Sequence, residues 1–127
     1  MPLIKNKVGE AGEKIAADYL RRERFKILEM NYKNYSGRRL GEIDIIAKEN
    51  NEIVFVEVKT RNLQKYSATL PEENITYSKL HKLSKIAENY LRQRNLLDYA
   101  YRFDAVSVWL DPEMRQAKIK HLRNIYL

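Results

Sequence analysis

Two aliphatic segments of this sequence carry charged residues where a buried strand would ordinarily have none. Residues 41–47 read GEIDIIA, and residues 53–59 read IVFVEVK. Because side chains alternate along a strand, Glu42 and Asp44 share one face of the first segment. Glu57 and Lys59 share one face of the second segment for the same reason. An unpaired carboxylate is costly to bury, so these groups need partners.

The Asn-Asn dipeptide at 50–51 separates the two segments. Asparagine tolerates positive φ, so the dipeptide predicts a hairpin turn. A two-residue loop places Asp44 opposite Glu57 and Glu42 opposite Lys59, with Cβ atoms about 4.5–5.5 Å apart. A four-residue loop keeps this register, whereas a one-residue slip turns one strand's charges to the other face.

The two predicted cross-strand pairs differ in their chemistry. Glu42 and Lys59 form an ion pair, whereas Asp44 and Glu57 bring two like charges together. Like charges are unfavourable at this distance unless a proton or a cation is shared between them. Hard divalent cations such as Mg²⁺ take carboxylate oxygens. The spacing alone fits a metal site and a solvated face of mixed charges equally well, and the flanking aliphatic residues favour the metal site.

The elements that position these residues follow from periodicity and turn signals. Apolar residues at helical spacing predict a first helix from Val8 to near Arg24, and a second helix capped by Thr76 or Ser78. The remaining expectations are strands at 25–32, 42–48, 52–60, 103–110 and 117–125, and loops at 34–39 and 61–75. This order predicts a mixed α/β fold, with a mixed sheet of about five strands flanked by helices.

The composition narrows the class of protein. Cysteine is absent, which excludes disulfides, thiolate zinc sites and cysteine nucleophiles. Lys and Arg number 24 against 17 Asp and Glu, a net charge of +7 that is typical of proteins that bind nucleic acid but also occurs in ordinary basic proteins. No stretch approaches the roughly 20 apolar residues of a membrane span, and residues 1–14 lack the apolar region of a signal peptide. We therefore expect one cytoplasmic domain over residues 1–127, without membrane contact.

A series of motifs also runs along the chain in a fixed order. It comprises GEAGEKIAADYL at 9–20, NYK at 31–33, GEID at 41–44, VEVKTR at 56–61, SK at 78–79 and RFD at 102–104. The series resembles the YraN family of small bacterial predicted endonucleases, and the resemblance extends from Gly9 to about Tyr126. The family is similar to the restriction-endonuclease-like superfamily, whose signature is Asp…Glu-x-Lys, and more distantly to archaeal Holliday-junction resolvases.

The resemblance implies roles for five residues. Asp44 and Glu57 would hold Mg²⁺ or Mn²⁺ together with the main-chain carbonyl of Val58. Lys59 matches the catalytic lysine, which would stabilise developing negative charge or orient the attacking water. Glu13 matches a fourth catalytic position. It would hold a second metal ion or accept a proton through water, and both roles stay open.

The resemblance also implies a restriction-endonuclease-like fold and metal-dependent hydrolysis of DNA, with branched or junction DNA as one expected substrate. Glu42 and Asp104 match supporting positions. Basic residues are expected to bind the phosphates, namely Arg38, Arg39, Arg61, Lys65 and Lys79. A homodimer is an expectation by analogy with the resolvases alone. The alternatives are a non-catalytic module that binds nucleic acid, and a subunit that needs a partner protein for activity.

Overall fold

The order of helices and strands is the one that the sequence predicts. A computed structural model describes residues 3–34, 41–63, 76–111, 113 and 115–125. Its elements are α1 (Leu3–Arg22), β1 (Lys26–Lys33), β2 (Glu42–Glu49), β3 (Glu52–Asn62), α2 (Tyr77–Gln93), β4 (Ala100–Leu110) and β5 (Ala117–Leu122). The mixed α/β fold class is therefore confirmed. Neither helix is long and apolar enough to cross a membrane within these ranges.

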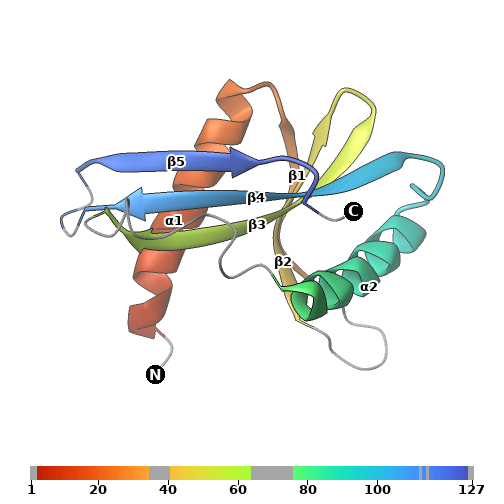
Figure 1. Cartoon of the computed structure of the whole chain (residues 1–127). Coiled ribbons are helices and arrows are strands. Elements are labelled where there is room, and N and C mark those ends of the chain that lie inside the picture. Colours follow the sequence, from red (N-terminus) through yellow and green to blue (C-terminus); the bar gives the residue numbers. More distant parts are fainter. Residues whose placement is uncertain (1–2, 35–40, 64–75, 112, 114, 126–127) are drawn as a thin grey trace.

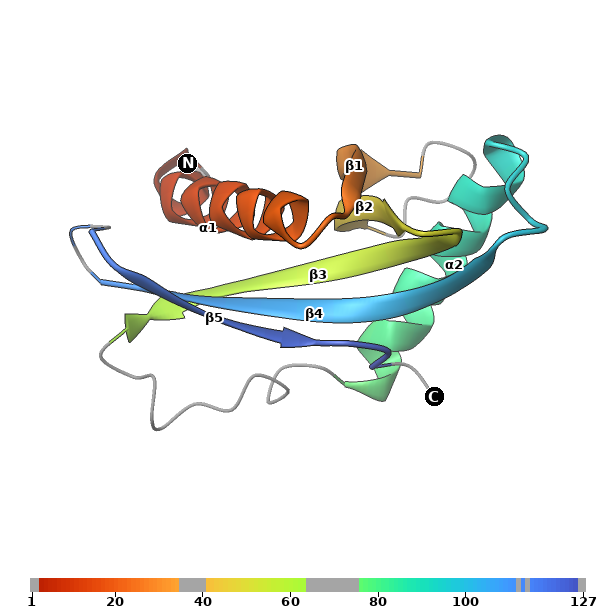
Figure 2. The ribbon, with the colours of Figure 1, turned by 90° about the horizontal axis from the view of Figure 1, so that it is seen from above.

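The five strands form one mixed sheet in the order β1-β2-β3-β4-β5. All neighbouring strands are antiparallel except β3 and β4, which run parallel. A parallel pair needs a crossover connection, and α2 lies within it. In Figure 1, α1 passes behind β3 and β4, and Figure 2 shows α1 on one side of the sheet.

Each helix covers its own face of the sheet because the side chains of β3 alternate. Val54, Val56 and Val58 pack in the core that includes Ala16 and Leu20 of α1. The intervening residues of β3 face the opposite side of the sheet. There they pack in a second core, which includes Ile53, Phe55, Leu83, Ile86, Tyr90 and Phe103. Because Glu57 and Lys59 continue the second series, they belong to the face that α2 covers.

The hairpin between β2 and β3 has the predicted register. Asn50 adopts a φ of 55° in the two-residue turn, and the ladder runs from Glu49 opposite Glu52 to Ile45 opposite Val56. The predicted helix cap is also confirmed, since the Thr76 side chain accepts a hydrogen bond from the backbone N–H of Lys79. The register brings Asp44 toward Glu57, and the cap fixes the first turn of α2, which carries Lys79.

Five element boundaries differ from the prediction by two residues or more. Helix α1 begins at Leu3 instead of Val8, and β4 begins at Ala100 instead of Phe103. The helix α1 ends at Arg22, because Arg24 has a φ of 72° and turns the chain into β1. Strand β3 continues to Asn62, since it stays in register with β4 as far as Leu110; Arg61 therefore lies in a strand and not in a loop. Strand β5 ends at Leu122, and Asn124 has a φ of 57°.

The close approach of α1 to β3 depends on Gly12. A Cβ atom on this residue would lie 1.9 Å from Oγ1 of Thr60. No side chain fits in that space, so a glycine at this position lets α1 lie directly on β3. The neighbouring residue, Glu13, is thereby brought toward the sheet, as the small residues of this helix predict.

Candidate active site

The candidate site lies at a fork where β2 separates from β3. The ladder between these strands ends at Ile45 and Val56. Ile43 packs in the core on the α2 face, whereas Ile45 packs in the core on the α1 face, so regular alternation is broken at Asp44. Oδ2 of Asp44 accepts a hydrogen bond of 2.8 Å from the backbone N–H of Val58. This side chain therefore replaces a ladder acceptor at the point where pairing stops.

The fork removes one predicted ion pair. Glu42 is in register with Lys33 of β1, and the β2–β3 ladder has already ended before Glu42 could face Lys59. The Glu42–Lys59 ion pair is consequently not formed. The prediction extended a regular hairpin past the residues where the strands diverge, and Lys59 instead pairs within its own strand.

Glu57 is the partner of two lysines. Its Oε2 lies 2.6 Å from Nζ of Lys79 and 3.3 Å from Nζ of Lys59. Lys59 follows two positions along β3, whereas Lys79 comes from the first turn of α2, which the Thr76 cap fixes. Glu57 is 8% exposed, so its charge is largely removed from water and depends on these ammonium groups.

Two carboxyl groups at the fork, those of Asp44 and Glu13, have raised pKa values. Burial and the negative charge of Glu57 raise the pKa of Asp44 to about 8, against the opposing hydrogen bond from Val58. Burial also raises the pKa of Glu13, and the charge of Glu42 adds to this effect. Asp44 and Glu13 interact directly, so the predicted catalytic carboxylates do meet.

The two lysines are affected in opposite directions. Burial lowers the pKa of Lys59, and the nearby positive charge of Lys79 lowers it further. Burial alone would also lower the pKa of Lys79, but the contact with Glu57 outweighs burial and raises it. The carboxylate of Glu57 thus favours the charged form of Lys79 more than that of Lys59.

These groups line an open cleft of about 640 Å³ between the two helices and the fork. The lining includes residues of both helices and three strands: Gly9, Glu10, Glu13, Asn31, Lys33, Gly41, Glu42, Asp44, Glu57, Lys79, Lys82, Leu83 and Ile86. We refer to this space as the cleft. Asp44, Glu57, Glu13, Glu42 and Lys79 are therefore gathered in one place, with Lys59 beside Glu57.

Sequence reasoning gave no role to Asn31, Glu10 and Lys82, which also line the cleft. In β1, the neighbours of Asn31 pair with the two residues on either side of Asp44, so Asn31 lies across from Asp44. The backbone of Asn31 has a φ of 54°. Its place within the motif NYK was a usable signal. For Lys82, the signal was its position three residues after Lys79 on one helix, a spacing that places two side chains on neighbouring parts of the helix surface.

The donor chemistry of the cleft suits a hard divalent cation. Asp44 and Glu57 repel each other, and a cation would relieve that repulsion. No group of three acidic or histidine side chains that could hold a metal ion is found among the described residues. Mg²⁺ usually takes only one or two protein carboxylates and keeps several waters, so two carboxylates at an open cleft suffice.

Arg61 lies away from the lining of the cleft. It sits on β3 in register with Trp109 of β4, and its Nε and Nη2 atoms are buried without a hydrogen-bond partner among the described residues. Three more of the predicted phosphate-binding residues, Arg38, Arg39 and Lys65, fall outside the described residues, and the fifth, Lys79, lines the cleft. The phosphate-binding role of all five stays a prediction.

Asp104 belongs to a separate cluster of charges, which β4, β5 and the turn end of the β2–β3 hairpin form together. Its carboxylate, which is fully buried, accepts hydrogen bonds from Nε of Arg102 at 2.9 Å and from the backbone N–H of Asn124 at 2.9 Å, and pairs with Nε2 of His121 at 2.7 Å. Arg102 also bonds Glu49 and Glu52. Burial would raise the pKa of Asp104, but His121 and Arg102 outweigh it and lower the pKa.

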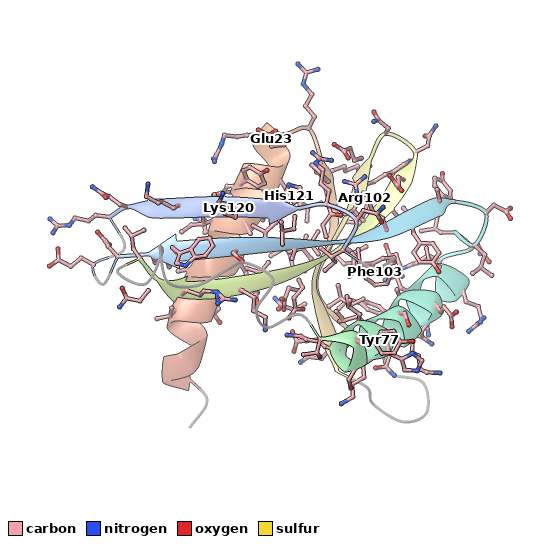
Figure 3. The ribbon with its side chains drawn as sticks, in the orientation of Figure 1. Glu23, Tyr77, Arg102, Phe103, Lys120 and His121 are labelled. Atoms are coloured by element: carbon pink, nitrogen blue, oxygen red, sulfur yellow. The ribbon has the colours of Figure 1, made fainter. Side chains whose placement is uncertain are left out.

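We call these five side chains, Asp104, Arg102, His121, Glu49 and Glu52, the Asp104 network. Figure 3 shows Arg102 and His121 together, on the opposite side of the labelled Phe103 from Tyr77 at the start of α2. The network joins the turn end of the β2–β3 hairpin to β4 and β5. The structure therefore places Asp104 in a fully paired anchor outside the cleft.

Comparison with known proteins shows the family. A family model described as "Uncharacterised protein family UPF0102" matches residues 12–108. A UPF0102 protein of Caldanaerobacter subterraneus subsp. tengcongensis is 44% identical over 96% of both chains. Others are 40% identical in Caldicellulosiruptor bescii, over 94% of this chain and 96% of the relative, and 36% identical in Clostridium beijerinckii, over 99% and 98%. The chain belongs to UPF0102, the YraN family that its motifs resemble.

Proposed function

We propose that this protein is a metal-dependent nuclease that hydrolyses phosphodiester bonds in DNA. The observation that carries the proposal is the meeting of Asp44 and Glu57 at the fork. Asp44, whose pKa is raised by burial and by the charge of Glu57, and Glu57 itself line an open cleft, with Lys59 beside Glu57. Strongly perturbed ionisable groups in a cleft are typical of catalytic sites. The net charge of +7 favours a polyanionic substrate.

Five residues in or beside the cleft have a role in this proposal. Asp44 and Glu57, with the carbonyl of Val58, would hold Mg²⁺ or Mn²⁺, which when bound would supply Lewis acidity at the phosphoryl group. Lys59 places a positive charge next to Glu57, where it can stabilise negative charge on the phosphoryl oxygens. Glu13 has a raised pKa and contacts Asp44, which suits it to accept a proton from the attacking water.

The substrate is proposed by chemistry rather than by sequence. Phosphate groups would be bound by basic side chains near the cleft, so binding should weaken with salt and carry little base specificity. Branched or junction DNA as the preferred form, and a homodimer as the active form, stay predictions of the family resemblance. Neither follows from the geometry of one chain.

A cleavage assay tests the proposal. Purified protein is incubated with linear, flapped and four-way DNA in Mg²⁺, in Mn²⁺ and in chelator. We expect metal-dependent cleavage, and a loss of about 100-fold or more in Lys59→Ala, since removal of one charge-stabilising group costs about that much. Lys85→Ala is the matched control because Lys85 is exposed on α2 and does not line the cleft.

Two outcomes would contradict the proposal. Full activity in a rigorously purified Lys59→Ala protein would mean that the cleavage comes from a contaminant or from another site. Tight DNA binding by the wild-type protein without cleavage in either metal would instead favour the non-catalytic binding module.

A further inference from the structure

The lysine nearest to Glu57 is the one that comes from the helix. Nζ of Lys79 is 2.6 Å from Oε2 of Glu57, whereas Nζ of Lys59 is 3.3 Å from the same oxygen. The side chain of Lys79 is also the more exposed of the two, at 31% against 23%, and it lines the cleft. The closest positive charge to this carboxylate therefore reaches it from the open side.

A carboxylate oxygen in such a contact cannot receive a divalent cation without change. Two positive charges on one oxygen would lie within a few ångströms of each other, where their repulsion is strong because the site is partly removed from water. Glu57 is one of the two carboxylates that would hold the metal ion. The ammonium group of Lys79 therefore occupies the position beside Glu57 that the metal ion would take, and it supplies the positive charge that the ion would otherwise supply.

We propose, resting on the proposed function, that Lys79 is an internal counter-ion of Glu57 that a divalent cation must displace, and that the released ammonium group then binds a phosphate of the DNA. Lysine suits this exchange because its ammonium is a compact charge on a flexible four-carbon stem. The start of α2 does not need to move, since the Thr76 cap bonds the backbone N–H of Lys79 and leaves its side chain free to turn.

Lys59 keeps a positive charge beside Glu57 while the metal ion replaces Lys79. When Lys79 leaves, Lys59 still contacts the buried Glu57, so this carboxylate is never left without a positive neighbour. Lys82 offers a matched comparison. It lies on the same helix and lines the same cleft, but within the part of the chain that the structure describes it forms no ion pair with Glu57.

Mn²⁺ binding without DNA is the first test. Isothermal titration calorimetry compares the wild-type protein with Lys79→Met, Lys79→Arg and Lys82→Met. We expect Lys79→Met to bind Mn²⁺ about tenfold more tightly, the scale of one charge-assisted contact that no longer has to be broken. Lys79→Arg keeps the competing charge and should not gain affinity. Lys82→Met should gain less than about twofold, because it removes only a screened, more distant charge.

Chemical labelling of lysines in the unaltered protein is the second test, and it does not depend on a variant that folds. An amine-reactive reagent is applied with and without Mg²⁺, and each lysine is quantified by mass spectrometry. We expect labelling of Lys79 to rise several-fold with Mg²⁺ while labelling of Lys82 stays constant.

The outcomes separate this inference from the proposed function. If the wild-type protein binds Mn²⁺ and Lys79→Met binds it no more tightly, Lys79 is not displaced and the inference alone is overturned. Unchanged labelling of Lys79 at saturating Mg²⁺ would overturn it in the same way. If the wild-type protein binds neither ion, the metal-dependent function is overturned together with this inference.

Discussion

Two aspartates, the buried Asp104 and the half-buried Asp44, show how the same side chain is used in opposite ways. Asp104 accepts hydrogen bonds from Arg102 and a backbone N–H and pairs with His121, and its pKa is lowered. Asp44 accepts one backbone N–H and faces Glu57, and its pKa is raised to about 8. The charge of Asp104 is thus satisfied by the protein, whereas the charge of Asp44 is opposed by Glu57 and would be relieved by a proton or an added cation.

This difference separates an anchor from a binding site. The Asp104 network holds the hairpin turn against β4 and β5 and has no need of a ligand. The fork holds carboxylates together at an electrostatic cost, which is a common property of sites that bind cations. If the comparison is right, substitutions at the two aspartates will have opposite effects on stability.

The largest effect is expected at Asp104. Asp104→Ala leaves Arg102 and His121 facing a vacated, buried position, and breaking a buried ion pair in this way costs about 3–5 kcal/mol. Urea unfolding followed by circular dichroism measures the change in the free energy of unfolding. Asp98→Ala is the control, because Asp98 is exposed and should change stability by less than about 0.5 kcal/mol. A loss as small as that of the control would show that the network is not an anchor.

The next effect is the response of stability to metal. A ligand that binds only the folded state adds RT ln(1 + [L]/Kd), or about 2.7 kcal/mol at a hundredfold excess over Kd. Mn²⁺ or Mg²⁺ should therefore raise the melting temperature of the wild-type protein in differential scanning fluorimetry. Asp44→Asn removes one charge of the pair, so we expect it to melt above the wild-type protein in chelator and to respond much less to metal.

The lost metal response is the firmer part of this prediction, because the asparagine keeps an acceptor for Val58 but weakens that hydrogen bond. If Asp44→Asn gains as much from metal as the wild-type protein does, Asp44 is not a ligand.

The dependence of stability on pH should also differ between the two aspartates. The pKa of Asp44 rises from 3.8 to about 8 on folding, so between these values the folded state binds more protons than the unfolded state. The wild-type protein in chelator should consequently lose stability as the pH rises through this window, by at most about 1.4 kcal/mol per pH unit from this group. Asp104, whose pKa is lowered, contributes stability that is lost only in acid.

Unfolding in urea from pH 5 to pH 8 measures this slope, with Asp44→Asn as the matched protein that lacks the group. Equal slopes in the two proteins would mean that Asp44 is charged throughout the range and that the repulsion at the fork is weaker than its pKa indicates.

The smallest expected effect is on DNA binding. Lys79→Ala removes about one phosphate contact, so the slope of log affinity against log salt should become shallower by about one unit or less. Fluorescence anisotropy with labelled DNA at several salt concentrations measures it. Lys85→Ala again serves as the exposed control on the same helix, and an identical slope for the two variants would place Lys79 away from the DNA.

Local patterns were enough to predict part of this architecture. The Asn-Asn turn fixes the hairpin register, and Thr76 caps α2, because both depend on residues close in sequence. The ordered motifs also identified the family, and they grouped Glu13, Asp44 and Glu57, which all line the cleft.

Contacts between distant segments were beyond local patterns. Strands β2 and β3 diverge on the side of Ile45 that is away from the turn, and alternation does not predict this. The predicted Glu42–Lys59 pair is therefore absent from the described residues. The supporting role of Asp104 is a prediction of the family resemblance, and its contact with His121, 17 residues away on another strand, follows from no local pattern. The contact between Lys79 and Glu57 depends on where the crossover helix lies, which no short pattern specifies.

The close contact at Gly12 restricts where α1 can lie along β3. Since a Cβ atom there would overlap Thr60, only a glycine can stand at the crossing point of α1 and β3. A slide of the helix by one turn would bring Ala16 to that point, and its methyl group would meet the same obstruction. Sliding in that direction is therefore blocked, so Gly12 helps to fix how far along the strand the carboxylate of Glu13 lies.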